Sequence, residues 1–301
     1  MKIKELSALL FHAAVKGDEE AEVHGIEMDS RKVQSGDLFV CVRGERFDGH
    51  HYAKEAVEKG ASALLVQEVL DIAVPQIVYA DTRYAMAVFA AHYYGYPSSS
   101  MKLIGITGTN GKTTTSMILE QLLASQGKQT GLMGTIQIKI GDEIREVSNT
   151  TQEACVLQKS FRQMVERGAE YCVMEVSSHA LHFGRVLGCD FRTAIFTNLT
   201  QDHLDFHHTM DRYLQTKSLL FSRLGNTFNN EPLRRKYAVM NEDDPTSEYL
   251  RQVTAAQVIT YGFEPAADVR ADQIRLTAGV TEFHLSTFAG EAEVKMKLVG
   301  K

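Results

Sequence analysis

The sequence predicts an α/β protein with two units: a small α/β unit, then a doubly wound, mostly parallel sheet with an antiparallel extension. Three observations lead to this fold class. Short apolar runs alternate with helical patterns along most of the chain, a glycine-rich turn follows one of these runs at residues 105–111, and strict alternation begins after Asp268. The length of 301 residues also fits two domains.

The first unit is predicted to cover residues 1–97. Its apolar runs predict buried strands at 38–42, 63–66 and 76–79. Its helical patterns lie at 51–59, which stops before Gly60, and at 82–94. The sequence GYPSSS at 95–100 then interrupts the pattern, which indicates a linker.

The second unit is predicted to cover residues 98–301. It begins with a strand at 102–106 that runs into the glycine-rich turn, and a helical pattern follows at 117–123. Further predicted elements are buried strands at 171–174, 193–196, 238–240 and 258–261, helices at 154–167 and 210–221, and antiparallel strands at 272–276 and 281–285. Ligands of such a sheet bind at the carboxyl ends of the strands.

The glycine-rich turn reads TGTNGKTTT from Thr107 to Thr115. Between a strand and a helix, backbone N–H groups face a phosphate, Lys112 neutralises charge, and Thr113 can ligate Mg²⁺. The general P-loop has a glycine five residues before Gly111, where this chain has Ile106. This difference disfavours a generic P-loop kinase. The whole run predicts a short-form ATP loop, against the alternative of a turn that binds nothing.

Composition excludes several classes of protein. The net charge of −6 and the pI of about 6.0 do not suit a nucleic-acid or anionic-membrane partner. No apolar run has the length of a membrane span, and no signal-peptide layout is present. We therefore expect a cytoplasmic protein. The four cysteines form no CxxC pair and are expected to be reduced core residues: Cys41, Cys155, Cys172 and Cys189.

Two polar clusters follow predicted strands. Glu175 stands at a strand end, where a carboxylate can hold Mg²⁺ beside phosphates; the alternative is a helix-capping Glu-Ser pair. Asp202 and His203 suit metal binding or acid–base chemistry. The alternative there is a solvated polar loop, which is the expectation for His207 and His208.

Two further segments carry alternatives. Lys217 lies in the helical pattern at 210–221 and would by default be exposed, so it matters only if the helix directs it into the ATP cleft. The polar segment Asn149, Thr150 and Thr151 precedes a predicted helix, and either threonine would suit its N-cap.

Five motifs together resemble those of the Mur ligase family, in the same order: TGTNGKTT, NTT, MEVSSHAL, TNLTQDHLDFH and YLQTKSLLF. In the first unit, DSR at 29–31, GDLFV at 36–40 and FDGH at 47–50 are similar to the first domain of that family. NTT and EVSSHAL favour the MurE branch, the UDP-N-acetylmuramoyl-dipeptide:amino-acid ligases. The resemblance covers nearly the whole chain.

The resemblance implies a role for each matching residue. ATP would bind Gly108, Thr109, Asn110, Gly111, Lys112, Thr113, Thr114 and, near adenine, Asn241 with Asp243 and Asp244. Mg²⁺ would bind Thr113, Glu175, His203 and a carbamylated Lys217, so that Lys112, Lys217 and His203 are the implied catalytic residues. The uridine end would meet Ser30, Glu45, Arg46 and Phe47, and the dipeptide Asn149, Thr150, Thr151, Ser177 and Arg185.

Two positions depart from the family pattern. Many members have proline where this chain has Gln152, and some have glutamine where it has Phe183. Phenylalanine cannot donate the corresponding hydrogen bond, so that contact is not carried over.

The implied activity is ATP-dependent ligation of meso-diaminopimelate or L-lysine to UDP-N-acetylmuramoyl-L-Ala-D-Glu through an acyl phosphate, in peptidoglycan precursor synthesis. Family members have a third domain for the incoming amino acid. We expect this chain to stop before that domain, to be inactive alone and to be a monomer. Two alternatives are folylpolyglutamate synthetase, disfavoured by the first unit, and a nucleotide-sugar-binding module without catalysis.

Overall fold

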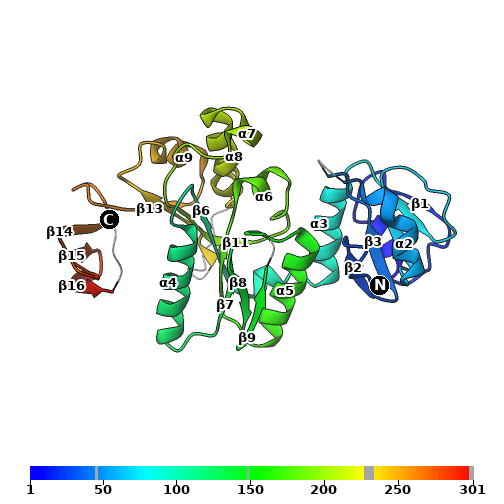
Figure 1. Cartoon of the computed structure of the whole chain (residues 1–301), viewed down its shortest axis with the longest axis horizontal. Coiled ribbons are helices and arrows are strands. Elements are labelled where there is room, and N and C mark those ends of the chain that lie inside the picture. The colour runs from blue at the N-terminus through cyan, green and yellow to red at the C-terminus, as the bar shows by residue number, and fades with distance from the viewer. Residues whose placement is uncertain (45–46, 148, 227–233, 298–301) are drawn as a thin grey trace.

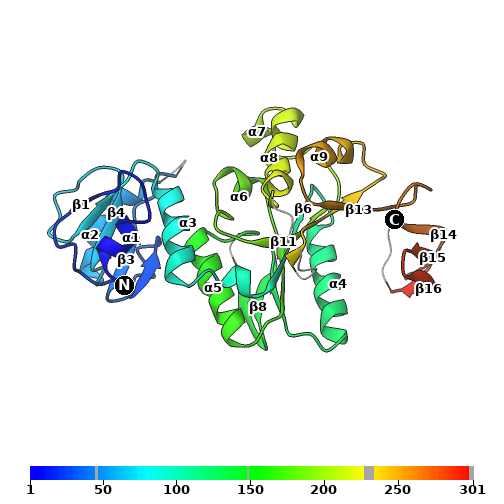
Figure 2. The same cartoon turned by 180° about the vertical axis from the view of Figure 1, so that it is seen from behind.

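The computed structural model describes residues 1–44, 47–147, 149–226 and 234–297. Its strands form one sheet of five strands and one of eleven. Both views place the first sheet at one end of the molecule and the strands β14–β16 of the second sheet at the other, with the rest of the second sheet between them (Figures 1 and 2). The predicted fold class is confirmed; the boundary at 97/98 stays a prediction.

The first unit consists of the five-stranded sheet and its helices. Its helices are α1 (Ile3–Ser7), η1 (Gly49–Tyr52), α2 (Ala53–Glu58) and α3 (Thr82–Tyr93), and its strands are β1 (Ala14–Lys16), β2 (Gly25–Glu27), β3 (Asp37–Val40), β4 (Ala63–Val66) and β5 (Gln76–Val78). The order is β1-β5-β4-β3-β2, parallel except for β1. Every predicted strand and helix of this unit is present, but the short elements α1, β1 and β2 were not predicted, because none of them carries a clear apolar run or periodicity.

Side chains alternate between the two faces of this sheet, as strand geometry requires. Leu38 and Val40 join the core under α3, whereas Phe39 joins the core under α2. Both faces are therefore covered by helices, which explains why β3 and β4 are apolar without interruption.

The second unit holds the eleven-stranded sheet. Its strands are β6 (Lys102–Thr107), β7 (Thr130–Met133), β8 (Gln137–Ile140), β9 (Glu143–Glu146), β10 (Tyr171–Glu175), β11 (Phe191–Phe196), β12 (Tyr237–Asn241), β13 (Gln257–Gly262), β14 (Val269–Thr277), β15 (Val280–Thr287) and β16 (Gly290–Met296). Its helices are η2 (Pro97–Ser100), α4 (Lys112–Ser125), α5 (Ala154–Glu166), α6 (Ser178–His182), α7 (Leu204–His207), α8 (Met210–Ser222) and α9 (Ser247–Val253).

The strand order is β16-β15-β14-β13-β12-β11-β6-β10-β7-β8-β9. The strands from β14 to β7 in this order are joined by parallel pairings, and both ends of the sheet continue as antiparallel strands. The predicted antiparallel extension is thus confirmed, and it gains a third strand, β16.

The main sheet is doubly wound. Ile104, Ile106 and Val173 face α4, whereas Leu103 and Met174 face the core that α5 and α8 cover. The strand β6 pairs with β10 on one side and β11 on the other, so the chain reverses its direction of travel across the sheet at β6. A ligand site is expected at this point, beyond the carboxyl end of β6.

The start of α5 connects the two units. Ala154 and Cys155 are buried in the same cluster as residues of the first sheet and α3. The helices α3 and α5 lie side by side in both views (Figures 1 and 2). The second unit therefore contributes directly to the first unit's core.

All four cysteines are free thiols, as expected. Cys41, Cys155 and Cys172 are buried, and burial raises the pKa of the Cys41 thiol to about 12. Cys189 is only partly buried, at the surface of the main core. None of the helices in the described part of the chain has the length and apolar character needed to cross a bilayer.

Candidate active site

The glycine-rich turn closes tightly against the loop that follows β11. Gly108 and Gly111 have positive φ values of 147° and 84°. A Cβ atom on Gly108 would lie 1.9 Å from Thr197 Oγ1, so no other residue fits there without movement. The backbone N–H of Thr109 donates to Asn198 O at 2.8 Å, and that of Asn110 donates to Asn198 Oδ1 at 3.0 Å. The turn is therefore held by the loop that follows β11 as well as by its own sequence.

Lys112 begins α4 and folds back over the turn. Its ammonium donates to Gly108 O at 2.9 Å and to Thr109 O at 2.8 Å. Burial lowers the pKa of Lys112, while the carboxylates of Glu175 and Asp202 act against this shift. The arrangement keeps a cation at the mouth of the turn, where a phosphate would lie.

Glu175 ends β10 and is almost fully buried. Its Oε2 accepts from Thr113 Oγ1 at 2.9 Å and from Thr135 Oγ1 at 3.0 Å, and its Oε1 accepts from the Thr135 N–H at 2.9 Å. The helix-capping alternative is confirmed for Ser177, which caps α6 by accepting from the Ala180 N–H, and is wrong for Glu175, whose carboxylate bonds Thr113 and Thr135 instead. A buried carboxylate beside a threonine hydroxyl is the donor set that a hard cation prefers.

The residues that the structure describes contain no group of three or more His, Cys, Asp or Glu side chains arranged to hold a metal ion. Thr113 and Glu175 therefore fit Mg²⁺ only as part of a ligand set completed by phosphate and water oxygens. Mg²⁺ commonly binds in this way, through one or two carboxylates and a substrate phosphate.

Lys217 is buried, so the default expectation of an exposed helix lysine is wrong. Its ammonium donates to Gly108 O at 2.8 Å and lies 4.4 Å from the centre of the Tyr213 ring. Burial, with a smaller effect of Lys112, lowers the pKa of Lys217 to about 7, and Asp202 acts in the opposite direction. Two lysines thus share one carbonyl oxygen of the phosphate loop.

The two histidines of the DHLDFH segment have different surroundings. The His203 side chain is half-exposed and lies 3.5 Å from Asp202 Oδ2, with its ring 5.0 Å from that of His179. His207 is buried, and its Nε2 lies 2.9 Å from Ser178 Oγ. The solvated-loop expectation is therefore wrong for His207, and burial lowers its pKa to about 4.

The predicted dipeptide contacts gather around the end of β10. Thr151 Oγ1 donates to Glu175 O at 2.9 Å and accepts from the Ser177 N–H at 3.0 Å, and Arg185 Nη1 donates to Thr151 O at 3.1 Å. Thr150 Oγ1 lies 3.2 Å from Thr135 Oγ1. Neither threonine caps α5, because the N-cap is Glu153. Asn149, also in this segment, accepts from Gln152 Nε2 at 2.7 Å through its carbonyl oxygen.

Asn241 ends β12, two strands from the phosphate loop. Its Nδ2 donates to Thr197 O at 2.8 Å, so it touches the same post-β11 segment that supports Gly108 and Asn110. Asp244 accepts from the Leu199 N–H at 2.7 Å. The predicted adenine-side residues therefore border the loop, and among the described residues no hydrogen bond joins Asn241 or Asp244 to Lys112 or Glu175.

The predicted uridine contacts belong to the first unit. Ser30 is buried, and its carbonyl accepts from Lys59 Nζ at 3.2 Å, whereas the Phe47 side chain is exposed. Glu45 and Arg46 lie outside the described residues. No hydrogen bond between described residues links Ser30 or Phe47 to the phosphate loop, so any joint site would need a ligand long enough to span both units.

Residues 106–301 match the family model of the Mur ligase middle domain, and residues 22–94 match that of the Mur ligase family catalytic domain. The chain belongs to the Mur ligase family. This Mur ligase chain is 52% identical over 279 residues to the UDP-N-acetylmuramoyl-L-alanyl-D-glutamate--2,6-diaminopimelate ligase of Geobacillus kaustophilus, covering 93% of the chain and 57% of the relative. It is 50% identical over 301 residues to the protein of that name from Bacillus licheniformis, covering 100% and 61%.

A solved structure of a UDP-N-acetylmuramoyl-L-alanyl-D-glutamate--2,6-diaminopimelate ligase is similar to this Mur ligase chain with a TM-score of 0.81 at 27% identity. The match covers 100% of the chain and 60% of that structure. The chain therefore spans about three-fifths of the length of the relatives it matches.

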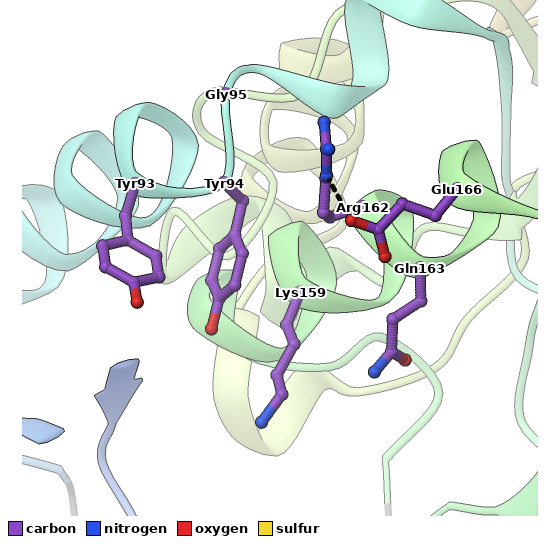
Figure 3. Close-up of a pocket in the computed structure, with 7 residues that line it drawn as sticks. All are labelled: Tyr93, Tyr94, Gly95, Lys159, Arg162, Gln163 and Glu166. Atoms are coloured by element: carbon purple, nitrogen blue, oxygen red, sulfur yellow. Dashed lines mark hydrogen bonds and ion pairs between the residues drawn. The ribbon is translucent and has the colours of Figure 1, made fainter. Parts of the chain in front are cut away.

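Two cavities of this Mur ligase chain were not predicted. One, of about 890 Å³, lies between α6, α7 and α8 and is bordered by His179, Phe206 and His207. The other, of about 450 Å³, lies between α3 and α5 (Figure 3). In Figure 3, Tyr93, Tyr94 and Lys159 extend in one direction, while Arg162 and Glu166 pair with each other. No family motif falls on this second cavity.

Proposed function

We propose that this chain forms the nucleotide-binding and sugar-peptide-binding part of an ATP-dependent ligase acting on UDP-N-acetylmuramoyl-L-Ala-D-Glu. One observation carries the proposal. The carboxylate of Glu175 accepts from Thr113 of the phosphate loop, while its backbone carbonyl accepts from Thr151 of the predicted dipeptide segment. A single residue thus lies between the place for the γ-phosphate and the place for the substrate carboxylate, which must meet for the reaction.

The reaction that fits is a two-step amide synthesis. The terminal carboxylate of the substrate attacks the γ-phosphorus of ATP, ADP leaves, and the amine of the amino acid then displaces phosphate from the acyl phosphate. Attack of one anion on another needs positive charge close by. When bound at Thr113 and Glu175, Mg²⁺ would supply part of that charge.

The chain's own residues would supply the rest of the positive charge and the other contacts to ATP. Lys112 holds its ammonium over the turn, so it can neutralise the β- and γ-phosphates. His203, half-exposed beside Asp202, is free to turn toward a second Mg²⁺. Gly108, Thr109, Asn110, Gly111 and Thr114 complete the loop in this proposal, and Asn241 borders the adenine.

Lys217 is proposed to be carbamylated. A neutral amine adds to CO₂ and loses a proton, which gives a carbamate with a carboxylate-like end. The lowered pKa of Lys217, about 7, supports this because a large share of the amine is neutral at physiological pH. The modification would convert a buried cation into an oxygen ligand for Mg²⁺.

The amino acid that we propose is diaminopimelate, since the relatives at 47–52% identity carry that substrate in their names. L-Lysine is the competing substrate. We further propose that the protein works in the cytoplasm, where ATP and nucleotide-sugar substrates are available, and that it is a monomer.

Calorimetry of the chain with UDP-N-acetylmuramoyl-L-Ala-D-Glu, with and without Mg²⁺–ATP, tests the proposal. We expect both ligands to bind. Binding of the sugar peptide without any binding of Mg²⁺–ATP would favour the nucleotide-sugar-binding module instead. A chain that is folded by circular dichroism and binds neither ligand would contradict both functions.

A further inference from the structure

A charged cluster joins the two units beside the predicted dipeptide contacts. Arg83 of α3 in the first unit places Nη1 3.1 Å from Glu153 Oε2, and Arg185 places Nε 2.8 Å from Glu153 Oε1. Their side chains are only 21%, 14% and 16% exposed for Arg83, Glu153 and Arg185 respectively. These pairs are therefore screened far less than the surface ion pairs elsewhere on the molecule.

The position of Glu153 is fixed by secondary structure. It is the N-cap residue of α5, in extended backbone conformation, and the next two residues are buried in the first unit's core. A carboxylate at a helix N-terminus is also favoured by the helix dipole. Glu153 thus holds one oxygen toward each guanidinium without needing to move.

Phe183 completes the cluster. The guanidinium carbon of Arg83 lies 4.9 Å from the centre of the Phe183 ring, and that of Arg185 lies 5.9 Å from it. The ring provides an apolar, electron-rich surface beside both cations, which helps to hold the two guanidinium groups in place.

The charges of the cluster do not cancel. Two guanidinium groups share one carboxylate, so the cluster carries a net charge of about +1. Arg185 forms an ion pair with Glu153 through Nε without a hydrogen bond, and it donates from Nη1 to Thr151 O. A guanidinium has five N–H donors, so Arg185 retains donors for another anion. If Arg83 were absent, Glu153 would neutralise Arg185 alone.

We propose that Arg83 is a positioning residue for substrate binding. From the first unit it shares the carboxylate of Glu153. It thereby keeps Arg185 oriented and offsets part of the negative charge of Glu153, so that the cluster presents a net positive charge toward the D-glutamate carboxylate of the substrate. This inference rests on the proposed function. It makes binding of the peptide end depend on the contact between α3 and α5, although Arg83 itself touches no substrate.

The test compares two ligands that differ only in the glutamate. Calorimetry is performed on the parent chain and on Arg83→Ala with UDP-N-acetylmuramoyl-L-Ala-D-Glu and with UDP-N-acetylmuramoyl-L-Ala. We expect Arg83→Ala to weaken binding of the first ligand about tenfold and to leave binding of the second unchanged. Arg83→Lys keeps the charge and should recover part of the loss.

Two further variants sharpen the result. Arg162→Ala removes an arginine whose exposed ion pair with Glu166 borders the α3–α5 cavity, and it should change neither affinity (Figure 3). In a Glu153→Gln background, adding Arg83→Ala should weaken binding of UDP-N-acetylmuramoyl-L-Ala-D-Glu little further, because the two residues act through one contact.

If Arg83→Ala lowered the affinity for both ligands equally, the proposal would be overturned, since that result indicates a general effect on the first unit. An unchanged affinity for the dipeptide ligand in a folded Arg83→Ala protein would overturn it as well. Failure of the proposed function has a different signature, because the parent chain would then bind neither ligand.

Discussion

The phosphate loop and the predicted uridine contacts differ in how far the protein itself holds them in place. Around the loop, Lys112, Glu175 and Lys217 are all engaged in hydrogen bonds within the protein, and the last two are fully buried. In the first unit, Phe47 is 70% exposed. The phosphate loop is thus preorganised, whereas Phe47 would depend on the ligand for its packing, so the loop should be the more sensitive of the two to small changes of shape.

Gly108→Ala should give the largest effect. The added Cβ would lie 1.9 Å from Thr197 Oγ1 and 3.0 Å from the Asn198 N atom, so the loop or the post-β11 segment must shift. We expect the affinity for Mg²⁺–ATP to fall about 100-fold in calorimetry.

Gly127→Ala is the matched control for Gly108→Ala. Gly127 also has a positive φ, 73°, but its Cβ would meet nothing within 4 Å. The Gly127→Ala protein should therefore lose some stability and keep its affinity for Mg²⁺–ATP. Similar losses of affinity in both variants would show that backbone strain alone, and not the packing of the loop, explains the effect.

Glu175→Gln should have the next largest effect. The variant keeps an oxygen that accepts from Thr135 but loses the negative charge beside Thr113. We expect the Mg²⁺ concentration that supports ATP binding to rise about tenfold, measured by Mg²⁺ titration at fixed ATP. Glu170→Gln, at a half-exposed carboxylate paired with Lys128, should leave this titration unchanged. An unchanged titration in Glu175→Gln would remove the carboxylate from the metal site.

The difference between the two regions also explains what the sequence could predict. The phosphate loop and Glu175 were predicted because each depends on a local signal, a glycine pattern or a polar residue at a strand end. The surroundings of Lys217 and His207 were not predicted, because they arise where α8 and α7 pack against segments about 110 and about 30 residues away, respectively.

The N-cap of α5 shows a subtler limit. Thr150 and Thr151 have better capping propensity than glutamate, yet the helix begins after Glu153. Contacts of Thr151 with Glu175 and Ser177 engage its hydroxyl elsewhere. The ion pair of Arg83 could not be predicted from the sequence, because its partner Glu153 lies 70 residues away.

Lys217 should give a moderate effect that depends on pH. Its pKa is about 7 in the folded chain and would be near its ordinary value of 10.5 in the unfolded chain. Between these values the unfolded state binds more protons, so the contribution of this group to the free energy of unfolding rises with pH; below pH 7 it is constant.

Urea unfolding in CO₂-free buffer at several pH values between 7 and 10 measures this contribution. Lys217→Met should flatten the rise of the urea midpoint with pH, while Lys128→Met, at an exposed lysine, should keep it. Equal slopes in Lys217→Met and the parent chain would show that the lysine is not held neutral by its surroundings.

Phe47→Ala should have the smallest effect. It tests the predicted uridine contacts of the first unit. Because the ring is 70% exposed, its loss should change the free energy of unfolding by less than about 0.5 kcal/mol. If the ring packs on the uridine end, affinity for UDP-N-acetylmuramoyl-L-Ala-D-Glu should fall about threefold. Phe11→Ala removes a ring of the same unit that is 85% exposed and should change neither quantity. Equal affinities of the Phe47→Ala, Phe11→Ala and parent proteins would remove Phe47 from the sugar site and leave the first unit's binding to its other residues.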